Sequence, residues 1–379
     1  MLYVYGFIFI LALTSDRKKK KPLALFTVLA LLIILMASNT HNPDYYIYKR
    51  WYEFNIIGTS EYLYFFISGL FNKIGFSFDI FRIIYSIICL LLINSTVRKI
   101  YGDSVFFWFL YFLYPFMMDV VQVRNFIAMS IFIYAIPLLL SKKRWDWLIF
   151  LALLAAAVFF QKIFILFLPV AFLMKFKESK IFKYIMVIGI LIVVMLTIFF
   201  SSGLGIVSNW LLENFAEYDF RINTYMKSNF EFVKQLFFVA ANFFLLFWSK
   251  KILDNRKKIE PEIFTRDLKA GLQFKFVELM YWINLFIFLY SPLIVINSSF
   301  SRLFRNVIPL NYLAAVCTIS FIKPDKSQKN LNKIIYISAI LGYALFNFGY
   351  RIYKDYLYSI LIPLFKYNYF FDFLLGSGG

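Results

Sequence analysis

The chain has 379 residues, of which 62% are apolar and 22% aromatic, with a formal net charge of +19 and a mean hydropathy of +0.73. A soluble globular protein is about 45–50% apolar, so the composition excludes that class and predicts an all-α polytopic membrane protein. The basic residues lie in short clusters between apolar runs. That pattern excludes a nucleic-acid-binding protein, which would carry a basic domain with interleaved aromatic residues.

Apolar runs recur along the chain, and several are shorter than the roughly 20 residues that a hydrocarbon core requires. We predict about 12 transmembrane helices, with a range of 11–14, in a single transmembrane domain over residues 1–375. The predicted spans are 2–14, 23–38, 79–96, 105–118, 124–140, 146–160, 163–174, 184–201, 233–249, 274–296, 303–322 and 334–349. Segments 61–75 and 351–366 are apolar but interrupted by charge, and each predicts an interfacial helix, a re-entrant helix or a further span. Residues 376–379, Gly-Ser-Gly-Gly, are interpreted as a cloning remnant.

Lysine and arginine predict the orientation, because they are enriched in loops that face the cytoplasm. Six loops hold 25 of the 40 basic residues: 15–22, 97–103, 141–146, 175–183, 249–269 and 323–333. They alternate with loops poor in basic residues, so all six face the cytoplasm if segment 61–75 does not cross. The N-terminus then lies outside. The longest outer loop, 202–232, is either a lid over a site or a solvated connector.

Several kinds of site are excluded by what the sequence lacks. His41 is the one histidine, which excludes a histidine-rich zinc site. There is no Walker A motif, and no Asp-x-Asp motif of the kind that holds a metal beside a nucleotide sugar. Cys89 and Cys317 lie in apolar runs, which indicates packing and no disulfide. We therefore expect no metal and no cofactor.

Four cations lie at the predicted outer ends of spans, against the charge rule. Arg124 opens the span 124–140, and an arginine at the centre of a membrane helix costs about 2.5–3.5 kcal/mol. Lys162 lies in a tight outer hairpin, and Arg302 and Arg305 are spaced to share one helical face. Arginine suits bidentate contacts to phosphate. These residues predict a site for a lipid-linked pyrophosphate; snorkelling to phospholipid headgroups is the alternative.

Carboxylates and aromatic residues at the same predicted depth supply further candidates. Asp44 is the first candidate for a general base or for orienting a sugar, although Asn-Pro-Asp also begins ordinary turns. Glu61 and Asp119 are the other candidate catalytic residues. The candidate sugar-binding residues are Tyr45, Tyr48, Gln122, Gln161, Arg221 and Tyr225. The tyrosines among them are equally typical of an interfacial aromatic belt.

In these residues the chain resembles the EpsG-like family of Wzy-type polysaccharide polymerases. The likeness extends in order over most of the chain, through Asp44-Tyr45, Tyr48, Glu61, Val123-Arg124-Asn125-Phe126-Ile127-Ala128, Phe160-Gln161-Lys162, Leu168-Pro169, Ser301-Arg302 and Tyr312. The family often has Gln at the position of Asn125 and His at the position of Gln161. The second departure removes the obvious base, so either another group takes that role or no strong base is required.

The resemblance implies a metal-independent membrane glycosyltransferase of the GT-C type in the bacterial cytoplasmic membrane, with its active site facing outside. It implies that undecaprenyl-pyrophosphate-linked oligosaccharide repeat units are joined at the outer leaflet into capsular, exo- or O-antigen polysaccharide. The implied partners are those lipid-linked oligosaccharides and the bilayer, together with a flippase and a chain-length regulator. An O-antigen-ligase-like transferase is an alternative from the same class. A transporter or flippase for a lipid-linked glycan is a different one, for which internal repeats are expected.

Overall fold

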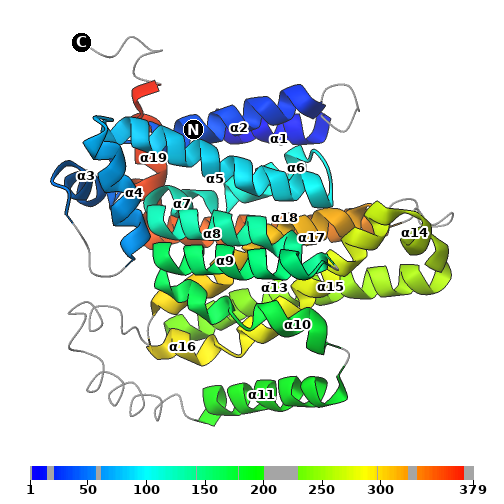
Figure 1. The fold of residues 1–379 in the computed structure, drawn as a ribbon. Coiled ribbons are helices and arrows are strands. Elements are labelled where there is room, and N and C mark those ends of the chain that lie inside the picture. The colour runs from blue at the N-terminus through cyan, green and yellow to red at the C-terminus, as the bar shows by residue number, and fades with distance from the viewer. Residues whose placement is uncertain are drawn as a thin grey trace.

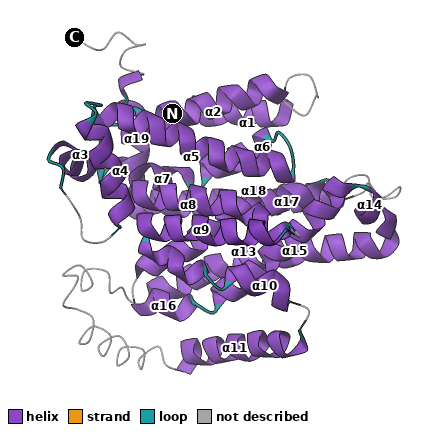
Figure 2. Ribbon diagram, viewed as in Figure 1, coloured by secondary structure: helices purple, strands orange, loops and turns teal. Residues whose placement is uncertain are grey.

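The computed structural model describes residues 2–14, 21–56, 61–141, 143–177, 179–199, 229–296, 298–322 and 331–370. Within these ranges the chain is almost entirely helical, and Figure 2 shows helices joined by short loops. The described residues form no β-strand, and an isolated antiparallel bridge pairs Asn39 with Asn368. The predicted all-α class is therefore confirmed.

Each predicted span overlaps a helix, or a pair of consecutive helices. These elements are α1 (Leu2–Thr14), α2 (Lys21–Ala37), α5 (Phe78–Ile100), α6 (Val105–Leu113), α8 (Val123–Ala135) with η1 (Ile136–Leu140), α9 (Arg144–Phe160), η2 (Lys162–Phe167) with α10 (Val170–Phe176), α11 (Lys180–Phe199), α13 (Asn229–Ile259), α15 (Leu268–Phe288), α17 (Ser301–Ile319) and α18 (Leu331–Arg351). The shorter elements are α3 (Tyr45–Glu53), α4 (Tyr62–Lys73), α7 (Phe116–Val121), α14 (Pro261–Arg266), α16 (Ser291–Ile296), η5 (Ser298–Phe300), η6 (Ile352–Leu361) and α19 (Ile362–Lys366).

Three stretches of the described chain are long and apolar enough to cross a membrane: Phe78–Ile100, Val123–Leu140 and Leu331–Arg351. Pro22–Ala37 and Tyr356–Lys366 are apolar helices of 10–17 residues. These helices fit a membrane protein, and the number of about 12 spans remains a prediction. The same is true of the GT-C-like arrangement.

The long helices run side by side, so the molecule has two ends (Figure 1). One end contains α3, α4 and α19, and we call it the α3 end. The opposite end contains α14, and we call it the α14 end. The predicted orientation puts the α3 end outside the cell and the α14 end in the cytoplasm. α4 stays at the α3 end and packs against α3 and α9, so segment 61–75 forms a short helix at that end.

The interior is built from α5, α6, α8 and α17, which supply large aromatic side chains such as Trp108, Tyr111 and Phe126. α8 packs between α5 and α9, and α17 packs against α6 and α15. By contrast, α11 lies at the edge of the bundle and exposes Ile185 and Ile188 (Figure 1). An exposed apolar helix at an edge is typical of a surface that contacts lipid or another protein.

The predicted span 105–118 is interrupted, and the interruption shapes the α3 end. α6 ends at Leu113 and α7 begins at Phe116, because Pro115 has no N–H with which to continue a helix. Gln122 then adopts φ −94° and ψ 69°, outside the helical region, and separates α7 from α8. These two breaks place Asp119, Gln122 and Arg124 at one end of the bundle on separate turns of the chain.

Candidate functional site

The predicted site residues in the described chain are brought to the α3 end by several different elements. Glu61 immediately precedes α4, and Gln122 and Arg124 lie where α7 meets α8. Lys162 is the first residue of η2, just after α9 ends. Arg302 and Arg305 occupy the first turns of α17. Side chains from segments up to about 240 positions apart in sequence therefore meet at one end of the molecule.

The Glu61 carboxylate is the centre of this cluster. It forms an ion pair with the Arg124 guanidinium, and its side chain is only 9% exposed. The backbone N–H of Lys162 donates a hydrogen bond to the same carboxylate, and Lys162 and Arg302 are close enough to act on its charge. Of the four predicted pyrophosphate-binding residues, Arg124, Lys162 and Arg302 thus surround one acidic group. We call Glu61, Arg124, Lys162 and Arg302 together the Glu61 cluster.

Burial raises the pKa of the Glu61 carboxyl above its ordinary value, although Arg124, Arg302 and Lys162 each lower it. The backbone of Glu61 is also unusual, with φ +64° in the left-handed region. For a residue other than glycine that conformation costs on the order of 1–3 kcal/mol and persists only where the surroundings enforce it. The carboxylate is therefore held in place by its contacts with the cations.

Two aromatic side chains of α3 pack against the Arg124 guanidinium. The guanidinium lies 5.2 Å from the centre of the Trp51 ring and 5.8 Å from the centre of the Tyr48 ring. Arg124 also donates a hydrogen bond to the Tyr48 hydroxyl. Such cation–π contacts hold a guanidinium in a fixed plane. Trp51 was missed from sequence, and its spacing of three residues from Tyr48 on one helical face is the signal that points to it.

A second set of polar contacts lies deeper, around Arg305. Its Nη2 donates a hydrogen bond of 2.5 Å to Oε1 of Gln122. Asp119 is 1% exposed and accepts a hydrogen bond of 2.9 Å from the Tyr111 hydroxyl, while its Oδ1 has no partner within the described chain. Asp119 is therefore enclosed by protein.

Asn125, which departs from the family pattern, has a structural partner. Its side-chain amide exchanges hydrogen bonds of 2.8 and 3.2 Å with the amide of Asn306, and both residues are buried. The pair joins α8 to α17 directly behind Arg124 and Arg305. It therefore fixes the distance between the two helices that carry the arginines.

The other predicted residues are less closely tied to the cluster. Asp44 caps the start of α3, where its N–H bonds to Oδ1 of Asn42, and its charge acts on Tyr48. Tyr45 is buried, with the Arg82 guanidinium 5.0 Å from its ring centre. Gln161 ends α9 and is half-buried beside Lys162. Arg221, Tyr225 and nearly all of the loop 202–232 lie outside the described residues.

Arg351 is a further cation at this end that the sequence analysis did not single out. It is the last residue of α18, and its Nη2 lies 3.3 Å from the Tyr114 hydroxyl, to which it donates. Its charge acts on Arg305, and both arginines line one small cavity. In the sequence, Arg351 could have been found as a cation just beyond the outer end of the predicted span 334–349.

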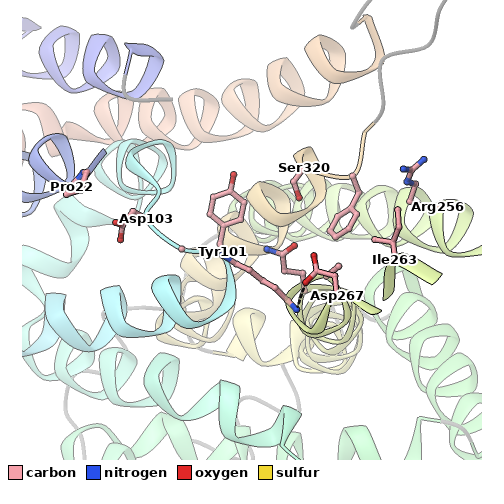
Figure 3. A pocket seen from close by; sticks show the side chains of 12 residues that line it. Pro22, Tyr101, Asp103, Arg256, Ile263, Asp267 and Ser320 are labelled. Atoms are coloured by element: carbon pink, nitrogen blue, oxygen red, sulfur yellow. Dashed lines mark hydrogen bonds between the residues drawn. The ribbon is translucent and has the colours of Figure 1, made fainter. Parts of the chain in front are cut away.

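A larger cavity of about 610 Å³ opens at the α14 end (Figure 3). Its polar lining includes Asp103, Arg256, Asp267 and Lys269. Asp103 and Arg256 already have partners, Arg98 at 2.8 Å and Glu260 at 2.6 Å. None of the predicted site residues lines this cavity.

The described residues contain no group of three His, Cys, Asp or Glu side chains that could hold a metal ion. Cys89 and Cys317 are both buried and form no disulfide, in agreement with the sequence analysis.

A model of the EpsG family matches residues 23–372, which include every described element of the α3 end. No curated protein and no solved structure matches the chain.

Proposed function

Since the chain belongs to the EpsG family, whose members are Wzy-like membrane proteins of the polysaccharide polymerase type, we propose that it joins glycan repeat units carried on undecaprenyl pyrophosphate. In this proposal the growing glycan on its lipid pyrophosphate is the donor. A second lipid-linked repeat unit supplies the acceptor hydroxyl. The reaction takes place at the outer leaflet, and the product is a capsular, exo- or O-antigen polysaccharide.

The Glu61 cluster carries the proposal. Transfer from a glycosyl pyrophosphate releases a diphosphate, and negative charge develops on its oxygens as the bond breaks. Preorganised cations that meet this charge can lower the barrier greatly; loss of one such donor costs about 10²–10³ in turnover in other enzymes. Arg124, Lys162 and Arg302 lie around one point and are held by α3, α4, α8, η2 and α17.

We assign the Glu61 carboxylate two successive roles. Before substrate binds, Glu61 neutralises Arg124; the ion pair between the two side chains supports this role. When the pyrophosphate binds to Arg124, Lys162 and Arg302, its negative charge neutralises Arg124 in place of Glu61. The Glu61 carboxylate is then free. Glu61 then accepts the proton of the acceptor hydroxyl as its oxygen bonds to the anomeric carbon. The bond from that carbon to the pyrophosphate oxygen breaks, and undecaprenyl pyrophosphate leaves with the bonding electrons.

Glu61 thereby takes the place that the sequence analysis gave first to Asp44. Asp44 lies at the start of α3, whereas Glu61 lies among the cations and contacts Arg124 directly. A general base must come within hydrogen-bonding reach of the proton that it removes, and it works best with a pKa near the working pH. The raised pKa of Glu61 brings it nearer to that condition. Asp44 remains a candidate for orienting the acceptor sugar, together with Tyr48 and Gln161.

The proposal is tested with purified protein in lipid nanodiscs, given undecaprenyl-pyrophosphate-linked repeat units from cells that lack the polymerase. The expected product is a ladder of lipid-linked glycans that differ by whole repeat units, together with free undecaprenyl pyrophosphate. Release of pyrophosphate lipid with transfer to a different acceptor, and without a ladder, would identify a ligase instead. Movement of the lipid-linked unit across a bilayer with no new glycosidic bond would identify a transporter.

A further inference from the structure

Arg82 is a buried arginine that belongs neither to the Glu61 cluster nor to the contacts around Arg305. It lies near the start of α5, and only 2% of it is exposed. Its Nη2 donates a hydrogen bond of 2.9 Å to the backbone carbonyl of Met36, in the last turn of α2. The last carbonyls of a helix have no partner within that helix. The bond therefore ties the end of α2 to α5.

The same guanidinium also contacts α3. Its Cζ lies 5.0 Å from the centre of the Tyr45 ring on α3 and 5.8 Å from the centre of the Phe78 ring on α5. Arg82 also donates a hydrogen bond to the Tyr85 hydroxyl, and its Nη1 lies 3.8 Å from the Asp79 carboxylate. Contacts of this kind offset the cost of removing a guanidinium from water. Arg82 therefore joins α2, α3 and α5 at one point.

α3 packs on its neighbours through one face. Its buried residues are Tyr45, Tyr48 and Tyr52, whose spacing of three and four places them on the same side of the helix. Near the end of α3, the Tyr52 ring stacks on the Phe81 ring of α5, with 5.4 Å between their centres. At the start of α3, Tyr45 packs on Arg82. Because Tyr48 lies between these two contacts, they fix its position together.

Tyr48 links α3 to the Glu61 cluster. Its hydroxyl accepts a hydrogen bond from Arg124, and its ring packs against the Arg124 guanidinium together with the Trp51 ring. Arg124 in turn forms the ion pair with Glu61. A bidentate contact between a guanidinium and an oxyanion depends on the plane of the guanidinium. A continuous series of contacts thus runs from Arg82 through α3 to the plane of Arg124.

We propose that Arg82 is a positioning residue for Arg124, because it holds α3 where Tyr48 and Trp51 keep the Arg124 guanidinium directed at the pyrophosphate. This inference rests on the proposed function, in which Arg124 meets the leaving diphosphate. Arg82 is itself enclosed by protein, so it acts through α3 and does not touch the substrate.

The test compares Arg82→Met with Gln273→Met in the nanodisc assay for the glycan ladder. Gln273 is a matched control, because its buried side chain donates a hydrogen bond of 3.2 Å to the carbonyl of Ile100, the last residue of α5. Each change therefore removes a buried bond to a carbonyl at a helix end, at opposite ends of the bundle. Arg82→Met should lower kcat by about 10- to 100-fold, since a small displacement of a catalytic group is costly. KM for the lipid-linked donor should change little, because the charges of the Glu61 cluster remain. Gln273→Met should keep the kcat of the natural chain.

The pH dependence of kcat/KM separates positioning from a loss of folded protein. Titratable groups from four elements face Glu61: Tyr48 on α3, Arg124 on α8, Lys162 on η2 and Arg302 on α17. The three cations among them each lower the pKa of the Glu61 carboxyl. If Arg124 is displaced in Arg82→Met, its effect weakens and the pKa of Glu61 rises further. The pH at which kcat/KM is half-maximal should therefore be higher than in the natural chain. A smaller amount of folded protein would lower the rate equally at every pH.

A double-mutant cycle with Tyr48→Phe tests whether Arg82 acts through α3. Tyr48→Phe removes the hydroxyl that accepts the hydrogen bond from Arg124, and it should also lower kcat. The double variant should be no slower than Arg82→Met, because in Arg82→Met the Tyr48 hydroxyl has already lost Arg124. Losses that multiply in the double variant would show that the two residues act independently, and they would overturn the proposal.

Normal kcat and an unchanged half-maximal pH in folded Arg82→Met would overturn the positioning role and leave the proposed polymerase intact. Equal changes in Gln273→Met would also overturn it, because they would follow from any lost buried bond. If the natural chain forms no ladder, the proposed function and the positioning role both fall. Thermal unfolding shows whether Arg82→Met is folded. Where it is not, Arg82→Lys decides. Its ammonium keeps the charge but lacks the planar fork that reaches Met36 and Tyr45 together. It should therefore show a smaller loss of kcat and a smaller pH shift in the same direction, and the absence of both rejects the proposal.

Discussion

The two ends of the bundle use the same charged residue types in different ways. At the α14 end several cations pair with carboxylates four or five residues away in sequence. These pairs are Arg98–Asp103 at 2.8 Å, Lys250–Asp254 at 2.5 Å, Arg256–Glu260 at 2.6 Å and Arg266–Glu262 at 2.9 Å. Pairs of this kind on a helix surface contribute only about 0.3–0.5 kcal/mol each. They balance the charges of that end locally.

The α3 end has local pairs as well, such as Lys49–Glu53 on the surface of α3, but there two largely enclosed cations have partners from distant parts of the chain. Arg124 meets Glu61, and Arg305 meets Gln122 across 183 positions. Cations outnumber carboxylates in the Glu61 cluster, and Arg305 carries a donor, its Nε, with no partner among the described residues. The comparison teaches that a charge is informative here when the fold buries it and leaves its pairing incomplete. Such a charge is available for a ligand, whereas a local surface pair is not.

Glu61→Gln should have the largest effect on activity. Loss of the base is expected to reduce turnover by about 10²–10⁴-fold while leaving the donor bound. Activity of the natural chain should rise with pH as Glu61 loses its proton. This rise is the acidic limb of the pH–rate profile. Because burial raises the pKa of Glu61, the midpoint of the limb lies at a pH above the ordinary glutamate pKa of about 4.3. The Glu61→Gln variant should lack this pH dependence, which initial rates measured at acidic and neutral pH would show.

The matched control for this change is Glu53→Gln at the same end. Glu53 lies 3.8 Å from Lys49 on the surface of α3, and its removal should leave turnover and its pH dependence unchanged. Near-normal turnover in Glu61→Gln, with the acidic limb retained, would contradict the role given to Glu61. A strong loss in Asp44→Asn alone would return that role to Asp44.

Arg124→Ala should have the next largest effect, a fall in turnover of about 10²–10³-fold. The leaving diphosphate would lose its bidentate partner, and Glu61 would lose its counter-ion. Arg124→Lys should recover only part of the activity, because a point charge cannot replace the fork. Arg98→Ala, which removes an exposed cation at the α14 end, should polymerise normally. An equal loss of turnover in Arg98→Ala and Arg124→Ala would contradict the proposed difference between the two ends.

Asp119→Ala should reduce stability more than an equivalent change at the other end. The variant leaves the buried Tyr111 hydroxyl without its acceptor and Arg305 without its nearest negative charge. A buried polar group that loses its partner costs about 1–3 kcal/mol. Asp103→Ala breaks a partly exposed pair with Arg98 and should cost about 0–1 kcal/mol. Thermal unfolding in detergent compares them, and equal shifts for the two variants would contradict the distinction.

The last experiment, labelling of single cysteines, is expected to change activity least, and it tests which end of the bundle faces outside. In a chain with Cys89→Ala and Cys317→Ala, single cysteines are introduced by Tyr46→Cys at the α3 end and by Leu268→Cys at the α14 end. Both positions are open, with 60% and 88% of the side chain exposed. A membrane-impermeant maleimide should label the first in intact cells and the second only after permeabilisation, with activity retained. The reverse pattern would invert the predicted orientation.

Much of the fold was predictable because it depends on local and additive properties. A long apolar run must form its hydrogen bonds internally, so every predicted span overlaps a helix. The unequal placement of lysine and arginine predicted that Arg124, Lys162 and Arg302 lie at the same end as one another. The family resemblance also rested on short motifs that are read along the chain, and it is confirmed.

Other features depend on which helices become neighbours, which no run of sequence states. Nothing in the sequence paired Glu61 with Arg124 or put Arg351 beside Arg305. Asp119 is also almost fully buried, although it is five residues from Arg124. Composition and charge pattern determined by themselves that this is a helical membrane protein with cations at one end. Only the packing of α3, α4, α8, η2, α17 and α18 decided which of those charges are buried together, because burial and pairing come from contacts between distant segments.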